Sequence, residues 1–208
     1  MPMDLTLNVP NGAASATLFI RHTHSVQAGP QERRTITSAG IELCRLASLF
    51  YIGLVRQLEE RFGTQAVYYA SPFIRSELTL WEIFHPEVRP IIDERLGFKA
   101  SLKDLQSGEF MKAHKGQSVH EIYADFVAIA GNDPAFKNDA LRYLNFVQDT
   151  SVAVKVGCAH ETSISNAARL FDLLPMEQLG LEECEGVIFF CSPDGHVIGA
   201  QKVAETNF

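Results

Sequence analysis

The sequence lacks several features that would define its class at once. No run approaches the roughly 20 apolar residues of a membrane helix, and the N-terminal segment shows no basic region followed by an apolar core. No cluster of Lys and Arg exceeds Arg33-Arg34, and the formal net charge is -7, whereas nucleic-acid-binding proteins usually have a basic stripe. We therefore expect a cytoplasmic protein with no membrane or nucleic-acid partner, in which an anionic substrate needs a local positive pocket.

Disulfide frameworks and metal sites are not indicated either. The 4 cysteines form no CxxC pair, and a chain of 208 residues can bury a sufficient core without disulfides. The histidines show no metal-ligand spacing with neighbouring Cys or Asp. The hydrophobic fraction of 46% and the charged fraction of 21% are close to those of ordinary globular proteins, and repeats are absent. The sequence thus predicts one domain, spanning residues 1–208, with free thiols and no metal site.

Apolar runs alternate with amphipathic stretches along most of the chain. Strands are predicted at 16–20, 67–70, 88–92 and 151–158, and helices at 37–62, 72–84, 138–149 and 162–174. Two further strands, 186–191 and 196–203, are joined by Ser-Pro-Asp-Gly, a strong hairpin signal. This alternation is typical of an α/β fold. We expect a three-layer α/β/α sandwich with a mostly parallel central sheet and an antiparallel edge.

The alternation is interrupted around residues 97–138. Polar stretches in this segment surround one clear helix, 118–130, which begins with Ser118 and Glu121 as a capping-box pair. We expect a lid-like insertion here, whose side chains reach the leaving group of a substrate and determine selectivity.

Three segments with reactive side chains follow predicted strands. Arg21-His22 comes after the first strand, the segment 71–75 with Arg75 after the second, and His160-Glu161 after the strand at 151–158. Because ligands of α/β sheets bind at the carboxyl ends of the strands, we expect these three segments to form one site.

Five segments resemble, in the right order, the motifs of the phosphoglycerate mutase-like histidine phosphatase superfamily. Residues 18–23, which include Arg21-His22-Thr23, resemble the family's strand ending in Arg-His-Gly or Arg-His-Thr. Residues 34–40 resemble its Arg-Pro-Leu-Thr-x-x-Gly helix start, and residues 70–76 resemble its Ser-Pro-x-x-Arg-Ala segment, with Thr79 also in place. The strands at 157–160 and 186–190 are similar to later family segments. The resemblance spans almost the whole chain except residues 99–137, and it implies a phosphoglycerate mutase-like fold.

The resemblance implies that Arg21, His22, Arg75 and His160 surround a transferred phosphoryl group. Physical chemistry agrees with these residue types. A neutral imidazole is a competent nucleophile, and cationic neighbours keep it unprotonated. The planar guanidinium groups match phosphate oxygens and stabilise charge in the transition state. These positive side chains take the role that Mg²⁺ plays elsewhere, so we expect neither a metal nor another cofactor.

A poor leaving group needs a proton from a nearby carboxyl group. Two glutamates are candidates for this general acid. Glu161 follows His160 directly and resembles the His-Asp pair of the histidine acid phosphatase branch, in which the residue after the second histidine donates the proton. Glu94 lies in a stretch that resembles the Asn-Glu-Arg of phosphoglycerate mutases. In an alignment on the Asp-x-x-Leu-x-Glu of many family phosphatases, Phe98 falls where the acid belongs. We favour Glu161 and keep Glu94 as the alternative.

The sequence therefore predicts a metal-independent phosphatase that acts on a small phosphorylated substrate through a phosphohistidine at His22. A phosphoglycerate-type mutase is the first alternative, although Thr23-His24 replaces the Gly-Glu that follows the first histidine in mutases. A catalytically silent phosphate-binding module of the same fold is the second. An edge strand would also be able to support a homodimer.

Overall fold

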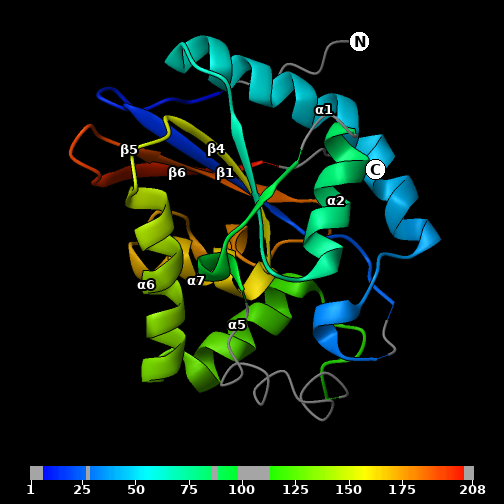
Figure 1. The fold of residues 1–208 in the computed structure, drawn as a ribbon. Coiled ribbons are helices and arrows are strands. Elements are labelled where there is room, and N and C mark those ends of the chain that lie inside the picture. Colours follow the sequence, from blue (N-terminus) through cyan, green and yellow to red (C-terminus); the bar gives the residue numbers. More distant parts are fainter. Residues whose placement is uncertain (1–6, 27–28, 86–88, 98–112, 204–208) are drawn as a thin grey trace.

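A six-stranded sheet forms the centre of the computed structural model, which describes residues 7–26, 29–85, 89–97 and 113–203 (Figure 1). The strand order is β3-β2-β4-β1-β5-β6. The strands are β1 (Ser15–Arg21), β2 (Val67–Ala70), β3 (Ile91–Ile92), β4 (Val154–Ala159), β5 (Gly186–Cys191) and β6 (Val197–Val203).

The sheet is parallel except at one edge. Strands β3, β2, β4 and β1 pair in parallel, β5 runs antiparallel to β1, and β6 runs antiparallel to β5. The predicted mostly parallel sheet with an antiparallel hairpin is confirmed. Arg21 is in register with Ala159, and Ala70 is in register with Cys158. The carboxyl ends of β1, β2 and β4 therefore lie at one edge of the sheet, within a residue of each other.

Helices cover both faces of the sheet (Figure 1). One layer consists of α1 (Ser38–Phe62) and α2 (Ile74–Phe84), and the other of α5 (Val119–Ala130), α6 (Pro134–Gln148) and α7 (Glu161–Leu170). Successive side chains of a strand point to opposite faces. Accordingly, Leu18 and Ile20 of β1 pack in the core with α1 and α2, whereas Phe19 packs in a second core with α5, α6 and α7. The predicted three-layer α/β/α sandwich is confirmed.

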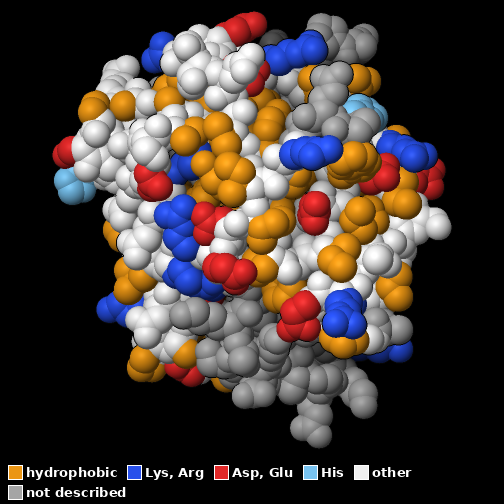
Figure 2. All heavy atoms as spheres, viewed as in Figure 1, with side chains coloured by type: hydrophobic (Ala, Val, Ile, Leu, Met, Phe, Trp, Pro, Cys, Tyr) orange, Lys and Arg blue, Asp and Glu red, His pale blue; other side chains and the backbone are white. Residues whose placement is uncertain are grey.

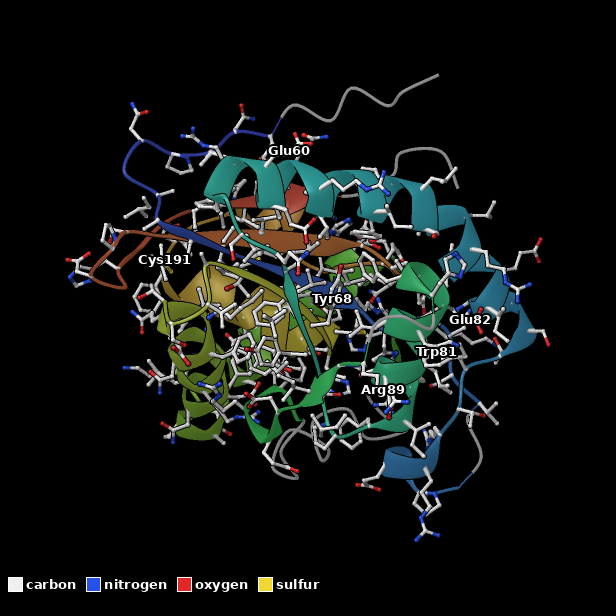
Figure 3. All side chains as sticks on the ribbon, turned by 45° about the horizontal axis from the view of Figure 1, so that its top comes forward. Glu60, Tyr68, Trp81, Glu82, Arg89 and Cys191 are labelled. Atoms are coloured by element: carbon white, nitrogen blue, oxygen red, sulfur yellow. The ribbon has the colours of Figure 1, made fainter. Side chains whose placement is uncertain are left out.

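The layer formed by α1 and α2 is held by apolar and ionic contacts. Tyr68 of β2 packs against Phe84 of α2, with ring centroids 5.0 Å apart. Glu82 of α2 pairs with Arg45 of α1 at 3.4 Å, and Figure 3 shows Glu82 and the neighbouring Trp81 on α2 beside the long helix.

Helix α1 has the limits that its end residues predict. The Thr37 side chain accepts a hydrogen bond from the Gly40 backbone N–H, and Gly63 closes the helix with a φ of 66°. A left-handed backbone of this kind favours glycine, so the residue past the helix end determines where α1 stops.

Length and composition alone would allow α1 to cross a membrane, contrary to the expectation that no run is long enough. The inward side of α1, including Leu54 and Leu58, is nevertheless buried against the sheet, and core helices of globular proteins meet the same criterion. The cytoplasmic location and the absence of a membrane partner stay predictions.

Several element limits differ from the predicted ones. Helix α2 begins at Ile74 rather than Pro72, and β4 begins at Val154 rather than residue 151. Helix α6 begins at Pro134 rather than 138, because the Asp133 side chain accepts from the Ala135 N–H and Pro134 occupies the first turn. Helix α7 ends at Leu170 rather than 174.

The described part of the predicted insertion contributes side chains to the second core. Helix α5 begins with the predicted capping box of Ser118 and Glu121. Its Tyr123 and Phe126 are buried, and the Phe126 ring lies 5.1 Å from that of Phe136 in α6. Burial of aromatic side chains stabilises this position of α5, and a role of the insertion in substrate selectivity stays a prediction. Residues 98–112, including Phe98, lie outside the described residues.

Candidate active site

His22 follows the last residue of β1, and its imidazole is oriented by a neighbouring backbone carbonyl. Nδ1 lies 2.9 Å from the Thr23 carbonyl oxygen, to which it donates, and Nε2 accepts a hydrogen bond from Arg75 Nε at 3.0 Å. In this tautomer the lone pair is on Nε2. Nε2 is therefore the nitrogen of His22 that can attack an electrophile.

The loop after His22 is fixed by α1 and α2. The Thr23 backbone N–H donates to Thr79 Oγ1, which itself donates to the Arg75 carbonyl. Gly40 of α1 approaches so closely that an added Cβ would lie 2.8 Å from the His24 carbonyl oxygen. Glycine at this position allows α1 to pack closely on the loop that follows His22.

Arg75 lies in the first turn of α2 and points back to the carboxyl end of β1. Its side chain is buried, its Nε contacts His22, and its Nη2 lies 3.4 Å from His160 Nδ1. The guanidinium carbon also lies 4.8 Å from the centre of the Phe73 ring. One guanidinium thus joins the two histidines that the sequence placed about 140 residues apart.

His160 is the N-cap residue of α7 and follows β4 directly. Its ring is buried, with its centroid 5.2 Å from that of His22 and 4.7 Å from that of Phe73, both in edge-to-face orientation. The structure therefore brings together His22, Arg75 and His160, as the sequence predicted from three separate strand ends.

Both histidines are neutral in this environment. Burial, followed by the positive charges of Arg75 and Arg21, lowers the pKa of His22 to about 3, although the bond to Thr23 opposes the shift. Burial, followed by the neighbouring His22, Arg75, Arg142 and Arg21, holds the pKa of His160 well below its usual value. Burial and the charge of Arg34 lower the pKa of Arg75 to about 10, which leaves it protonated at neutral pH. Two neutral imidazoles among cations form a site suited to a phosphate anion.

Arg21 lies beside this cluster, and its two terminal nitrogens also contact residues 181–183. Its Nη1 donates to the Leu181 carbonyl and its Nη2 contacts Glu183 Oε1 at 3.3 Å. Its positive charge still lowers the pKa values of His22 and His160. Sequence reasoning placed Arg21 at the phosphoryl group together with Arg75. The structure adds a carboxylate partner, Glu183, and the contact of Arg21 with a phosphoryl group stays a prediction.

Glu161, the favoured candidate acid, begins α7 beside His160. Burial raises the pKa of its carboxyl group, while the charge of Arg21 opposes the shift. Its Oε2 accepts a hydrogen bond from Thr162 Oγ1 at 2.9 Å. A raised pKa favours the protonated form that a general acid needs.

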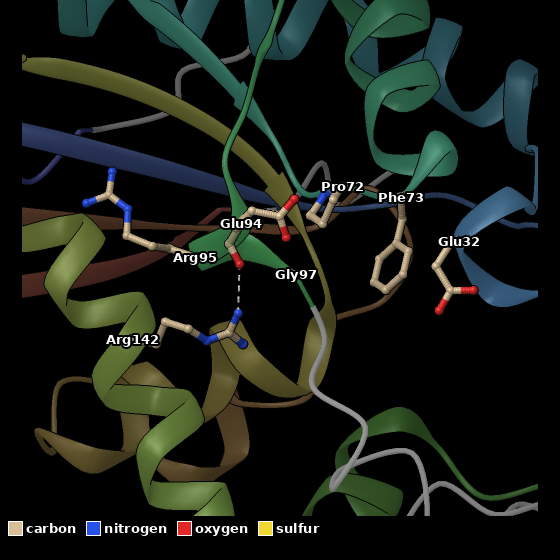
Figure 4. Close-up of a pocket in the computed structure, with 7 residues that line it drawn as sticks. All are labelled: Glu32, Pro72, Phe73, Glu94, Arg95, Gly97 and Arg142. Carbon is tan, nitrogen blue, oxygen red and sulfur yellow. Dashed lines mark hydrogen bonds between the residues drawn. The ribbon is translucent and has the colours of Figure 1, made fainter.

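Glu94, the alternative acid, is exposed and lines a cavity of about 570 Å³ next to the histidines (Figure 4). Arg142 of α6 donates to the Glu94 carbonyl at 3.0 Å from below, and Phe73 lies on the opposite side of the cavity. Phe73 lines this cavity and also contacts both His160 and Arg75, so one side chain borders the cavity and the site. The lining residues are Glu32, Pro72, Phe73, Glu94, Arg95, Gly97 and Arg142.

Sequence reasoning missed the roles of two arginines: Arg142, which lines this cavity, and Arg34, whose charge acts on Arg75. Arg142 is held by buried Asp139 and lowers the pKa of His160 through its charge. Arg34 was noted as part of a family-like segment but not as a neighbour of Arg75. Nothing in the neighbouring sequence marks Arg142 as a site residue, because it lies on an ordinary amphipathic helix. On the face of the molecule shown in Figure 2, Lys and Arg side chains alternate with Asp and Glu, so a local charge cluster does not stand out there.

Among residues 7–26, 29–85, 89–97 and 113–203, no group of three or more His, Cys, Asp or Glu side chains is arranged to hold a metal ion. The four cysteines are free and buried, with Cys44 Sγ and Cys184 Sγ 3.9 Å apart. The expectation of a metal-free reaction stays a prediction.

Comparisons with known proteins identify relatives of the fold. No protein-family profile and no curated protein sequence matches this chain. A phosphoserine phosphatase from Entamoeba histolytica, in complex with 3-phosphoglyceric acid, has a TM-score of 0.55 and 14% identity over 92% of this chain and 98% of that one. A phosphoglycerate mutase from Bacillus anthracis str. Sterne has a TM-score of 0.55 and 13% identity, covering 92% and 94%.

The protein histidine phosphatase SixA, complexed with tungstate, has a TM-score of 0.50 and 15% identity, covering 91% of this chain and 94% of that one. All three proteins are members of one superfamily of phosphatases and mutases. At identities this low the shared property is the fold, and the chemistry has to be argued from the side chains.

Proposed function

We propose that this chain, which has the phosphoglycerate mutase-like fold of the histidine phosphatase superfamily, is a metal-independent phosphatase that works through a phosphohistidine at His22. The observation that supports this proposal best is the contact of Arg75 Nε with His22 Nε2 at 3.0 Å, beside His160. It combines a neutral nucleophile with a buried cation at the place where a phosphoryl group would bind.

In the first step, the Nε2 lone pair of His22 attacks phosphorus while the bond from phosphorus to the leaving oxygen breaks. The N–H of Arg75 that occupies Nε2 moves to a phosphoryl oxygen as the substrate binds. Arg75, Arg21 and neutral His160 then donate to the three equatorial oxygens and stabilise their charge in the transition state.

A carboxyl proton is transferred to the leaving oxygen in the same step. We assign this proton to Glu161, whose raised pKa supports a protonated state, and keep Glu94 at the cavity as the alternative. In the second step, the carboxylate accepts a proton from water, and the resulting hydroxide attacks phosphorus. The bond to Nε2 breaks, which releases inorganic phosphate and restores His22.

The cavity beside Phe73 would hold the leaving group. Its size suits a small molecule. The neighbours in fold include a phosphatase of phosphoserine and a phosphoglycerate mutase, which supports small phosphorylated metabolites as the substrate class.

The test is turnover of p-nitrophenyl phosphate by wild type, by H22A, and by H196A as a control at the exposed turn between β5 and β6. H22A should lose turnover while its circular dichroism stays unchanged, and H196A should keep wild-type turnover. A rapid quench that avoids acid should trap label on His22 from a ³²P-labelled substrate. Turnover by H22A equal to wild type would eliminate the mechanism.

The same experiment separates the alternatives. A mutase would isomerise phosphoglycerate faster than it releases phosphate, and a silent binding module would bind phosphate without a trapped phosphohistidine. Either result would replace the phosphatase proposal.

A further inference from the structure

Residues 181–185 pass beside the end of β1 and are fixed to the backbone of Arg21. The Arg21 N–H donates to the Glu185 carbonyl at 2.8 Å, and the Cys184 N–H donates to the Arg21 carbonyl at 3.2 Å. This segment therefore keeps a constant position relative to the candidate phosphoryl site.

The same segment holds the Arg21 side chain. Nη1 of Arg21 donates to the Leu181 carbonyl, and Nη2 lies 3.3 Å from Glu183 Oε1. His24 Nε2 lies 3.2 Å from the same Glu183 oxygen. Because the side chains of Arg21 and Glu183 are only 18% and 21% exposed, water screens this ion pair less than one on the open surface.

The backbone next to Glu183 has a strained conformation that the surroundings maintain. Cys184 has a φ of 60°, in the left-handed region that residues other than glycine rarely adopt. It is buried, its carbonyl accepts from the Tyr51 hydroxyl at 2.5 Å, and its Sγ contacts Cys44. Such strain persists where the neighbouring structure over-determines it, often near functional sites. The anchored Cys184 leaves Glu183 directed at Arg21.

A second carboxylate lies within electrostatic reach of Arg21. The charge of Arg21 lowers the pKa of Glu161, which burial otherwise raises. The bonds to Leu181 and Glu183 use one N–H of each terminal nitrogen, and a guanidinium has five N–H donors. Donors remain for an anion beside His22.

We propose that Glu183 is a positioning residue that holds Arg21 so that its remaining donors face the phosphoryl site. The inference rests on the proposed function, because it assumes that Arg21 contacts the phosphoryl oxygens. Glu183 itself does not touch the substrate, and it acts only through Arg21.

Binding of inorganic phosphate, measured by calorimetry, tests this role without turnover. The E183A variant should bind phosphate about tenfold more weakly than wild type, because the released guanidinium loses its charge-assisted bonds to the anion. E183Q should stay within about threefold of wild type, because its amide oxygen can still accept from Arg21 Nη2. In an R21A background, E183A should cause no further loss.

Three outcomes would overturn the inference. Phosphate binding by E183A that equals or exceeds wild type would make Glu183 a spectator or a competitor of phosphate. A loss that persists in the R21A background would assign Glu183 a general structural role. No phosphate binding by wild type would remove both the inference and the site. Phosphate binding by wild type without a trapped phosphohistidine would instead refute only the proposed function.

Discussion

At the scale of single residues, the site depends on two histidines that burial and nearby arginines keep uncharged. The bond from Nδ1 to the Thr23 carbonyl selects the tautomer of His22, and Arg75 occupies its other nitrogen. The free energy of unfolding therefore depends on pH, because the unfolded chain binds protons at these histidines that the folded chain excludes.

The unfolding free energy should therefore fall in acid. The pKa of His22 is about 3 in the folded state and 6.5 in the unfolded state, so between these values the unfolded state binds more protons and stability rises with pH. Each such histidine contributes a slope of up to about 1.4 kcal/mol per pH unit. Urea titrations between pH 4 and pH 7 should give a shallower slope for H22N than for wild type. H196N is the control, and an unchanged slope in H22N would contradict the assignment.

The two candidate acids can be separated by the leaving group. An aryl phosphate needs little protonation of its leaving oxygen, whereas an alkyl phosphate needs a proton donor. E161Q should therefore lose about 10²–10⁴-fold in kcat/KM on an alkyl phosphate and much less on p-nitrophenyl phosphate. E94Q is the matched control at the cavity. The reverse pattern, with the selective loss in E94Q, would assign the acid to Glu94.

At the scale of elements, a buried lysine joins α6 to the sheet. Lys155 of β4 is buried, and its Nζ donates to the Phe146 carbonyl, to the Val147 carbonyl at 3.1 Å and to the Asp149 carbonyl at 2.7 Å. These carbonyls end α6, where no further turn of helix supplies donors. Burial lowers the pKa of Lys155 to about 8, yet the three acceptors hold the ammonium in place.

Replacement of this lysine should be costly. K155M leaves three carbonyls without their donor, two of them buried, and should lower the unfolding free energy by about 2–4 kcal/mol in urea denaturation. K137M, at an exposed position of α6, should change the free energy of unfolding by less than about 0.5 kcal/mol. Equal stability of the two variants would show that Lys155 does not hold the end of α6.

At the scale of the whole molecule, one sheet separates two cores that share β1. Leu54 of α1 belongs to the core on one face, and Phe136 of α6 belongs to the core on the other. A single domain, as the sequence predicts, should unfold both cores together.

Trp81 is the only tryptophan and lies on α2, so its fluorescence reports on one face alone. F136A, on the other face, should nevertheless shift the fluorescence and circular dichroism midpoints equally, at a cost of about 3–5 kcal/mol. L49A, at a position that is 82% exposed, should leave both midpoints nearly unchanged. Separate midpoints in F136A would mean that the two layers unfold as different units.

Much of the fold could be predicted because its signals are local. Thr37 and Gly63 mark the two ends of α1, and the capping box of Ser118 and Glu121 begins α5. Each of these signals involves only residues within four positions of one another. The predicted start of α6 was wrong because the Asp133-Pro134 cap was not recognised. The packing of α5 into the second core could not be predicted, because burial of Tyr123 depends on distant packing partners.

The sequence by itself determined the succession of strands and helices along the chain and placed His22, Arg75 and His160 just after strands. These features depend on hydrophobic periodicity and helix capping, which involve only nearby residues. Only the tertiary structure decided how their side chains are held. Arg21 contacts Leu181 and Glu183 across 160 and 162 positions, and Arg142 contacts Glu94 across 48. Such contacts arise when separate elements pack together, and no local pattern encodes them.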